Sequence, residues 1–233
     1  MACPNPPAGG GSGTLSAGPA RRLIWIPVVH SHADLGSLGE AVREAHARRF
    51  GAATWEERIR LVDEFWQRLR AEIGRLALDC RRVRLYQDGL PNCGHEAAIV
   101  RDLAQGGSAN HQLLADLMAK GARVVGTESP DLLIEEYELM RGILSALKSR
   151  DGHHLTPAER ERSKALLEKR DAHIAERIAQ TLGDGETGLL FLGMLHSVDG
   201  LLPNTIQVTR LFSLSSPESG RRPTTDPGSV EPR

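Results

Sequence analysis

Residues 23–31 read LIWIPVVHS and residues 189–197 read LLFLGMLHS, two apolar runs that end in the same dipeptide. A short, continuous apolar run is typical of a strand that is buried on both faces of a parallel sheet. Open α/β sheets bind their ligands at the carboxyl ends of such strands. The two runs therefore predict a pair of buried strands, and they mark His30 and His196 as candidate functional residues.

The chain between these runs alternates between helix and strand patterns. Residues 59–76 repeat apolar side chains every three or four positions, which predicts a helix over 54–78 with one buried face. Short apolar segments predict strands at 83–87, 122–126 and 206–212, and helical patterns cover 36–50, 95–104, 110–119, 131–148 and 157–182. Strands that alternate with helices predict an α/β fold, a mainly parallel central sheet with helices on both faces in a single domain.

Local composition predicts where the folded part and its helices begin and end. Residues 1–20 and 213–233 are rich in Pro, Gly and Ser, so we expect two disordered tails around one α/β domain at 21–212. The pairs Thr54 with Glu57 and Thr156 with Glu159 have the spacing of a capping box. Asn110 is a plausible N-cap for the helix at 110–119.

The composition is that of an ordinary globular protein. Of its 233 residues 40% are hydrophobic and 25% are charged, and the net charge is −1. Nucleic-acid binders usually carry a basic face, so no nucleic-acid partner is expected. The three cysteines have no C-x-x-C spacing, which argues against a disulfide framework or a structural zinc site. Without a membrane-length apolar run or an evident signal peptide, we expect a cytoplasmic protein with no membrane partner. The oligomeric state stays open.

Titratable residues follow four of the predicted strands. They are His30, Asp88, Glu128 and His196. Any one of them alone is more typical of a solvated loop start. Because the carboxyl ends of parallel strands share one edge of the sheet, we expect the four to lie close together and to form a site.

The first of these strand ends carries further candidate metal ligands. His30, His32 and Asp34 alternate, so in an extended segment they project from one face. Together with Glu128 and His196 they form a donor set that suits a divalent Zn, Mn or Fe ion. The alternative interpretation is that His32 caps the following helix or is merely exposed.

The predicted helix at 157–182 carries two charges on its apolar side. Arg170 and Asp171 lie three or four residues from Leu167 and Ile174, so they face the same way. Buried charges are costly unless they are paired. We expect Arg170 to reach Glu128 or Asp88, or to hold an anionic substrate group. A structural ion pair is the alternative. In the helix at 131–148 Tyr137 could line the site, whereas Glu135 and Glu136 fit a solvated face.

The order of these features resembles the TraB/ChaN/TIKI group of α/β proteins, to which erythromycin esterases are related. That group has a His after the first strand, an acid after an internal strand, an Arg-Asn pair on a long helix, and a strand that ends G-x-x-H. The matching positions here are His30, Glu128, Arg170-Asp171 and Gly193-x-x-His196. Two positions depart from the pattern: Pro27 stands where the group often has Gly, and Asp171 replaces Asn.

The resemblance implies a mixed set of functions, among them metal-dependent peptidases, haem- or iron-associated proteins and lactone hydrolases. We expect a small hydrolase that acts on a small molecule or a peptide. In this hypothesis His30, Glu128, Arg170 and His196 are catalytic, with or without a divalent metal ion, and Asp88, Asp171 and Tyr137 contact the substrate.

Three other functions remain open at this point. The same residues could bind a metal, haem or another small ligand without catalysis. The H-x-H at His30 and His32 also occurs in metal-dependent amidohydrolases, but residues 21–212 are too few for an eight-fold barrel. A purely structural or regulatory role is the third. A Ser-His-Asp hydrolase is disfavoured because no G-x-S-x-G motif is present.

Overall fold

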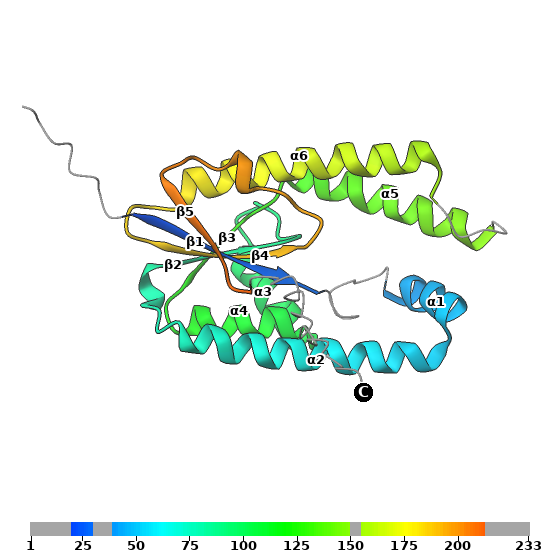
Figure 1. The fold of residues 1–233 in the computed structure, drawn as a ribbon, viewed down its shortest axis with the longest axis horizontal. Helices are drawn as coiled ribbons and strands as arrows, with labels where there is room; N and C mark the ends of the chain where they lie inside the picture. Colours follow the sequence, from blue (N-terminus) through cyan, green and yellow to red (C-terminus); the bar gives the residue numbers. More distant parts are fainter. Residues whose placement is uncertain (1–19, 30–38, 150–154, 213–233) are drawn as a thin grey trace, which may run out of the picture.

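The sheet places the two apolar runs side by side. The computed structural model describes residues 20–29, 39–149 and 155–212. Its parallel strands lie in the order β3-β2-β4-β1-β5 (Figure 1). They are β1 (Arg21–Val28), β2 (Val83–Gln87), β3 (Arg123–Val125), β4 (Thr187–Gly193) and β5 (Ile206–Arg210). Val28 of β1 pairs with Gly193 of β4, and the predicted parallel α/β sheet is confirmed.

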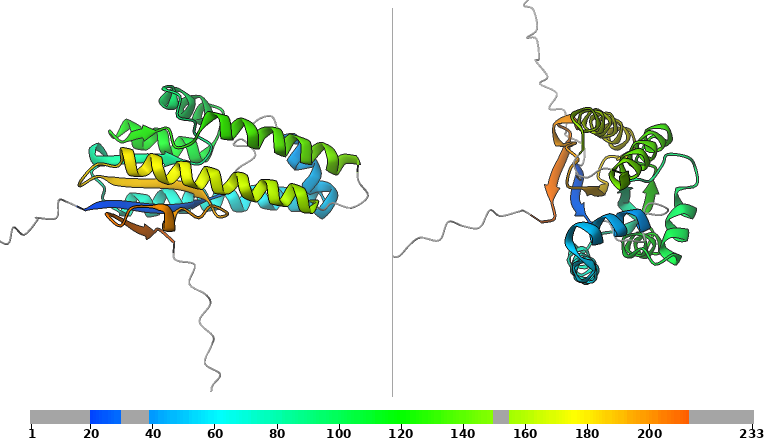
Figure 2. Two further views of the ribbon diagram at one scale, coloured as in Figure 1. Left: turned by 90° about the horizontal axis from the view of Figure 1, so that it is seen from above. Right: turned by 90° about the vertical axis from the view of Figure 1, so that its right-hand side faces the viewer.

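Helices cover both faces of this sheet, as the alternating pattern predicted. They are α1 (Gly39–Phe50), α2 (Ala52–Arg75), α3 (Glu96–Gln105), α4 (Ala109–Ala119), α5 (Pro130–Ser149) and α6 (Pro157–Thr181). α2, α3 and α4 lie on one side, α5 and α6 lie on the other, and α1 packs beside α2 (Figures 1 and 2). Short 3-10 turns, η2 (Cys80–Arg82) and η3 (Asp199–Leu201), precede β2 and β5. Among the described residues, no helix combines the length and the apolar character needed to cross a membrane.

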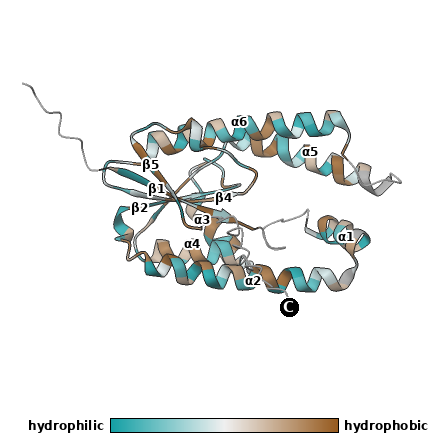
Figure 3. Ribbon diagram, viewed as in Figure 1, coloured by the Kyte–Doolittle hydropathy of each residue, from teal (hydrophilic) through white to brown (hydrophobic). Residues whose placement is uncertain are grey.

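Successive side chains along the strands point to opposite faces of the sheet and contribute to two hydrophobic cores. Leu189 and Phe191 of β4 join the core beneath α2 and α4, whereas Leu190 and Leu192 join the core beneath α6. Hydrophobic and hydrophilic segments alternate along α2 and α6, the pattern of a helix with one buried face (Figure 3). Ile59 was expected on that face but is 43% exposed, whereas Val62 and Trp66, further along α2, are buried.

Three N-terminal caps of helices were predicted from the sequence, and one of them is confirmed. The capping box of α6 is present: Thr156 accepts from the backbone N–H of Glu159, whose carboxylate accepts from the Thr156 N–H. The capping box at Thr54 is wrong, because α2 begins at Ala52 and the Thr54 hydroxyl donates back to the Gly51 carbonyl. Ser108, not Asn110, caps α4. The predicted tails at 1–20 and 213–233 lie outside the described residues except for Ala20.

Gly126 allows the turn after β3 to pack closely on the turn after β2. A Cβ atom at Gly126 would stand 2.4 Å from the Cα atom of Asn92 and 2.9 Å from its Cβ atom. Carbon atoms that are not bonded pack at about 3.5–4.0 Å, so any side chain here pushes the two turns apart. These turns carry Asp88 and Glu128 to the edge of the sheet.

We therefore expect Gly126→Ala to lower the free energy of unfolding by about 1–3 kcal/mol, the usual cost of overpacking. Denaturant unfolding measures this change. Gly142→Ala is the matched control, because Gly142 is exposed on α5 with no atom within 4 Å of an added Cβ. Alanine there should stabilise the helix by about 0.5–1 kcal/mol. A Gly126→Ala protein as stable as the wild type would contradict the close approach of the two turns.

Candidate functional site at the carboxyl edge of the sheet

Three of the four predicted strand-end residues meet around one arginine of α6. Asp88 directly follows β2, Glu128 lies three residues beyond β3, and His196 lies three residues beyond β4. Because β2 lies between β3 and β4, the three side chains reach the same part of the edge. Arg170 bridges two of them, and Asp171 beside it binds the third.

Arg170 is buried, and each of its three side-chain nitrogens donates to a carboxylate. Nε and Nη2 each lie 2.6 Å from an oxygen of Glu128, which makes the pair bidentate. Nη2 also donates to Asp88 Oδ1 at 2.9 Å, and Nη1 donates to Glu136. Of the predicted alternatives, the structure shows the contacts with Glu128 and Asp88. These carboxylates accept the hydrogen bonds that the guanidinium would otherwise donate to a substrate anion.

Glu128 is enclosed, with 1% of its surface exposed. Besides Arg170, it accepts a hydrogen bond of 2.8 Å from the backbone N–H of Gly89. Burial raises the pKa of the Glu128 carboxyl, and the paired guanidinium opposes this rise. Burial likewise acts to lower the pKa of Arg170, but the hydrogen bond and charge of Glu128 raise it further, so the net shift is upward. The arginine is charged at every physiological pH.

His196 is held by a carboxylate on each side of its ring. Nδ1 lies 2.5 Å from Asp171 Oδ1, and the other oxygen of Asp171 accepts from the backbone N–H of Ser197 at 2.8 Å. Nε2 lies 3.6 Å from Asp88 Oδ2. Burial acts to lower the pKa of His196, but Asp88 and then Asp171 raise it, so the net shift is upward. The ring therefore holds its proton to a higher pH than an ordinary histidine.

Asp88 connects the arginine to the histidine. Its Oδ1 atom accepts from Arg170, and its Oδ2 atom accepts from the backbone N–H of Gly193 at 3.0 Å and faces His196. The G-x-x-H turn after β4 is thus tied to the end of β2 through one carboxylate. A Cβ atom at Gly193 would lie 3.0 Å from Asp88 Oδ2, so glycine leaves room for this contact.

The contacts described above do not include four other predicted site residues. His30, His32 and Asp34 belong to residues 30–38, which the structure does not describe. Tyr137 is 39% exposed on α5, with the Arg141 guanidinium 5.8 Å from the centre of its ring.

Glu136 was expected on a solvated face, and its contact with Arg170 corrects that prediction. Its side chain is 40% exposed while it still reaches the arginine. The contact depends on how α5 packs on α6, which helix periodicity does not give.

A second polar group lies on the opposite face of the sheet. Ser108 and His111, at the start of α4, are buried, and Ser108 Oγ lies 2.7 Å from His111 Nδ1. Asn110 and Gln87 are each 1% exposed, and within the described residues Asn110 Oδ1 and Gln87 Oε1 have no hydrogen-bond partner. The sequence predicted a helix start here, with Asn110 as a plausible N-cap, but it did not predict the burial of this group.

The described residues do not form the predicted metal site by themselves. Within residues 20–29, 39–149 and 155–212, no group of three or more His, Cys, Asp and Glu side chains is placed to hold a metal ion. His196 Nε2 and Asp88 Oδ2, which face each other, supply two donor atoms. Of the predicted metal ligands, Glu128 and His196 lie in the described part of the chain, whereas His30, His32 and Asp34 lie outside it.

Comparison with known proteins adds no family to this description. No protein-family model, no curated protein and no solved structure matches the chain. The resemblance drawn from the sequence therefore stays a prediction.

Replacing Arg170 should destabilise the protein, because this arginine balances the negative charge of the buried carboxylates Glu128 and Asp88. Arg170→Met leaves Glu128 and Asp88 buried without their cation, so we expect a loss of about 3–5 kcal/mol in the free energy of unfolding at neutral pH. The loss should shrink as the pH falls towards about 4–5, because the uncompensated carboxylates become protonated. Arg141→Met is the control, since its pair with Glu138 is exposed and contributes less than about 1 kcal/mol. A pH-independent loss would contradict this assignment.

The raised pKa of His196 also predicts how stability depends on pH. The folded protein binds this proton more tightly than the unfolded chain does. The resulting stabilisation is complete below the ordinary histidine pKa of about 6.5 and is lost as the pH rises through the higher folded value. His196→Gln should therefore cost more unfolding free energy at about pH 6 than at about pH 9. His95→Gln, at an exposed position before α3, controls for the loss of a surface histidine.

Proposed function

We propose that this protein is a small hydrolase in which His196 is the general acid and base. The observation that carries the proposal is the placement of one buried imidazole between two carboxylates at the carboxyl edge of a parallel sheet. Structural ion pairs also occur at such edges. An ordinary structural ion pair, however, has no need of a histidine ring with a carboxylate facing each of its two nitrogens. Perturbed titratable groups that cluster in this way are typical of active sites.

The connections of the sheet support this location. After β2 the chain continues into α3 and α4 on one face, whereas after β3 it continues into α5 and α6 on the other. The connections therefore diverge at the ends of β2 and β3. Open α/β sheets bind ligands where neighbouring connections diverge in this way. Asp88 and Glu128 follow these two strands, and His196 follows the neighbouring β4.

The contacts of His196 support the following role in the proposed reaction. Asp171 accepts the proton on Nδ1, so Nε2 is the atom that exchanges a proton with the substrate. In its neutral form the ring takes a proton from a water molecule that adds to the carbonyl carbon of an ester, lactone or amide. The imidazolium, stabilised by Asp171, then returns that proton to the leaving oxygen or nitrogen as its bond to carbon breaks.

Arg170 and Glu128 then act as positioning residues. Their bidentate pair fixes Asp88, and Asp88 faces Nε2 of the histidine. Of the two roles that the sequence suggested for Arg170, this one corresponds to the contact with Glu128 and Asp88 and not to the contact with an anionic substrate group. It follows from the three carboxylates that already engage the guanidinium.

The test is a screen of esters, lactones and peptides with and without a chelator. We expect His196→Gln to lower turnover of a substrate found in this way by about 10²–10⁴-fold, the usual contribution of general acid–base catalysis. His95→Gln should retain full activity. The rate should rise with pH through an inflection above the ordinary histidine value, because the neutral ring is the base that starts the reaction. Asp88→Asn removes the largest upward influence on the pKa of His196, so the inflection should move to lower pH.

Unchanged turnover in His196→Gln, with a folded protein, would overturn the proposal. An inflection that stays in place in Asp88→Asn would contradict the role of Asp88. Ser197→Ala tests whether Ser197 is instead a nucleophile. The contact of Ser197 with Asp171 is made by its backbone N–H, which alanine keeps, so the proposal expects this variant to retain activity.

Metal, haem or small-ligand binding without catalysis is the second candidate, and the charge of the cluster favours a cation. Four carboxylates, those of Asp88, Glu128, Glu136 and Asp171, surround one guanidinium and one imidazole. Metal analysis of protein purified without added metal, with an absorbance spectrum for haem, tests this candidate. Bound metal that is lost in His30→Ala and His196→Ala, together with no hydrolytic activity, would favour binding over catalysis.

A further inference from the structure

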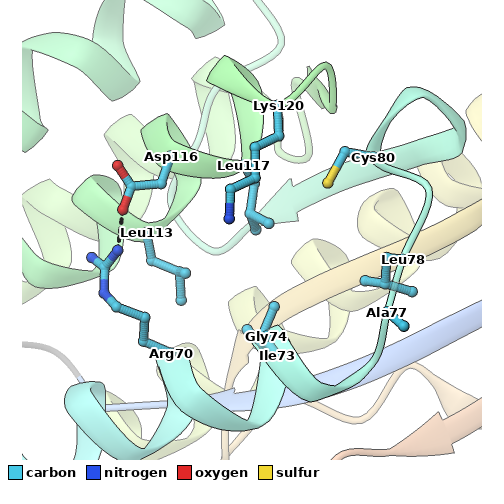
Figure 4. Close-up of a pocket in the computed structure, with 10 residues that line it drawn as sticks. All are labelled: Arg70, Ile73, Gly74, Ala77, Leu78, Cys80, Leu113, Asp116, Leu117 and Lys120. Atoms are coloured by element: carbon cyan, nitrogen blue, oxygen red, sulfur yellow. Dashed lines mark hydrogen bonds and ion pairs between the residues drawn. The ribbon is translucent and has the colours of Figure 1, made fainter.

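The last turns of α2 and α4 lie at the other end of the sheet. A cavity of about 280 Å³ opens there (Figure 4). α4 ends just before β3 begins, and η2 leads from α2 into β2, so the cavity lies at the amino ends of these strands. The acid–base cluster lies at their carboxyl ends. The cavity is therefore separate from the proposed active site, and no step of the hydrolase proposal uses it.

The floor of the cavity is apolar. Ile73, Leu113 and Leu117 line it, and each is buried and belongs to the core beneath α2 and α4. Ala77 and Leu78 continue the same lining where α2 ends. Such a floor holds an apolar group through contact and water exclusion. It offers no buried polar partner for a strongly hydrated ligand.

The rim of the cavity carries more positive than negative charge. Arg70 and Asp116 form an ion pair across one side, so these two charges cancel (Figure 4). Lys120 contributes a further cation, and in the described part of the chain its ammonium makes no ion pair. Asp79 and Arg81 stand on either side of the lining residue Cys80 and offset each other in charge, so the net positive charge of the lining is that of Lys120.

We propose that this cavity binds a small amphipathic carboxylate, with the apolar body on the floor and the carboxylate at Lys120. Charge complementarity at the rim selects an anion, and the floor selects an apolar body. The volume lies just below the range of about 300–1,000 Å³ that is usual for pockets of drug-sized ligands, so the ligand is smaller than those. A medium-chain fatty acid or an aryl carboxylate has this size and chemistry.

Three probes with the same apolar body separate charge from hydrophobicity. Octanoate, octanol and octylamine are titrated into the full-length protein by calorimetry. Octanoate should bind most tightly and octylamine least, because the rim is positive. Lys120→Gln should weaken octanoate binding by about two- to fivefold, the contribution of a partly exposed ion pair, and should leave octanol unaffected. Equal affinity for octanoate and octanol would overturn the proposal.

Gly74 allows the cavity to be filled from one wall. It lines the cavity, and a Cβ atom placed on it meets no atom within 4 Å. Gly74→Phe should abolish octanoate binding, whereas Gly74→Ala, the matched control, should retain it. Thermal unfolding of both variants shows that they are folded. Octanoate that still binds Gly74→Phe with wild-type affinity would place the ligand elsewhere and overturn the proposal.

The thiol of Cys80 gives an independent readout without altering the cavity. Cys80 is half-buried in the lining, and its sulfur points into the cavity (Figure 4). With Cys3 and Cys93 replaced by serine, the reaction of this thiol with a disulfide reagent is followed by absorbance. Octanoate should slow the reaction in proportion to site occupancy, and octylamine should not. A rate that octanoate leaves unchanged while it binds would also overturn the proposal.

Discussion

The bidentate contact between Arg170 and Glu128 fixes the position of α6 against the sheet. The apolar side chains of α6, Ile174 and Ile178, pack on the strands through dispersion and the hydrophobic effect, which have little direction. Two parallel hydrogen bonds of 2.6 Å do have direction. Taking both charges out of water is expensive and offsets much of their attraction, whereas the direction of the two hydrogen bonds favours one position of α6.

That arrangement determines where the candidate acid–base group lies. Arg170 and Asp171 are neighbours on α6, so the contact that fixes the first also brings the second to His196. Asp88 closes the arrangement from the other side, with one oxygen on Arg170 and the other facing Nε2 of His196. The protonation of the histidine and the geometry of the ion pair are therefore linked, and a change in either alters the field at the other.

The sequence could predict the meeting of Asp88, Glu128 and His196 because parallel strands present their carboxyl ends along one edge. It could also place Arg170 on the buried side of its helix, since residues three and four apart share a face. It could not give the position of β4 between β2 and β1, which depends on long-range pairing of similar apolar runs. The false capping box at Thr54 shows a related limit. The Thr-x-x-Glu pattern occurs twice. At Thr54 it lies inside α2, which Gly51 precedes, and at Thr156 it marks the true start of α6.

The polarity of the parallel sheet explains why its two ends differ in chemistry. Helices that follow strands begin at the carboxyl edge, and their free N–H groups favour negative charge there. Glu128 lies two residues before α5 begins, in keeping with this preference. At the amino edge α2 and α4 end, and their free carbonyl groups favour cations such as Lys120, the C-cap of α4. A site for an anion at this edge must therefore draw its positive charge from side chains, and Lys120 supplies it in the lining of the cavity.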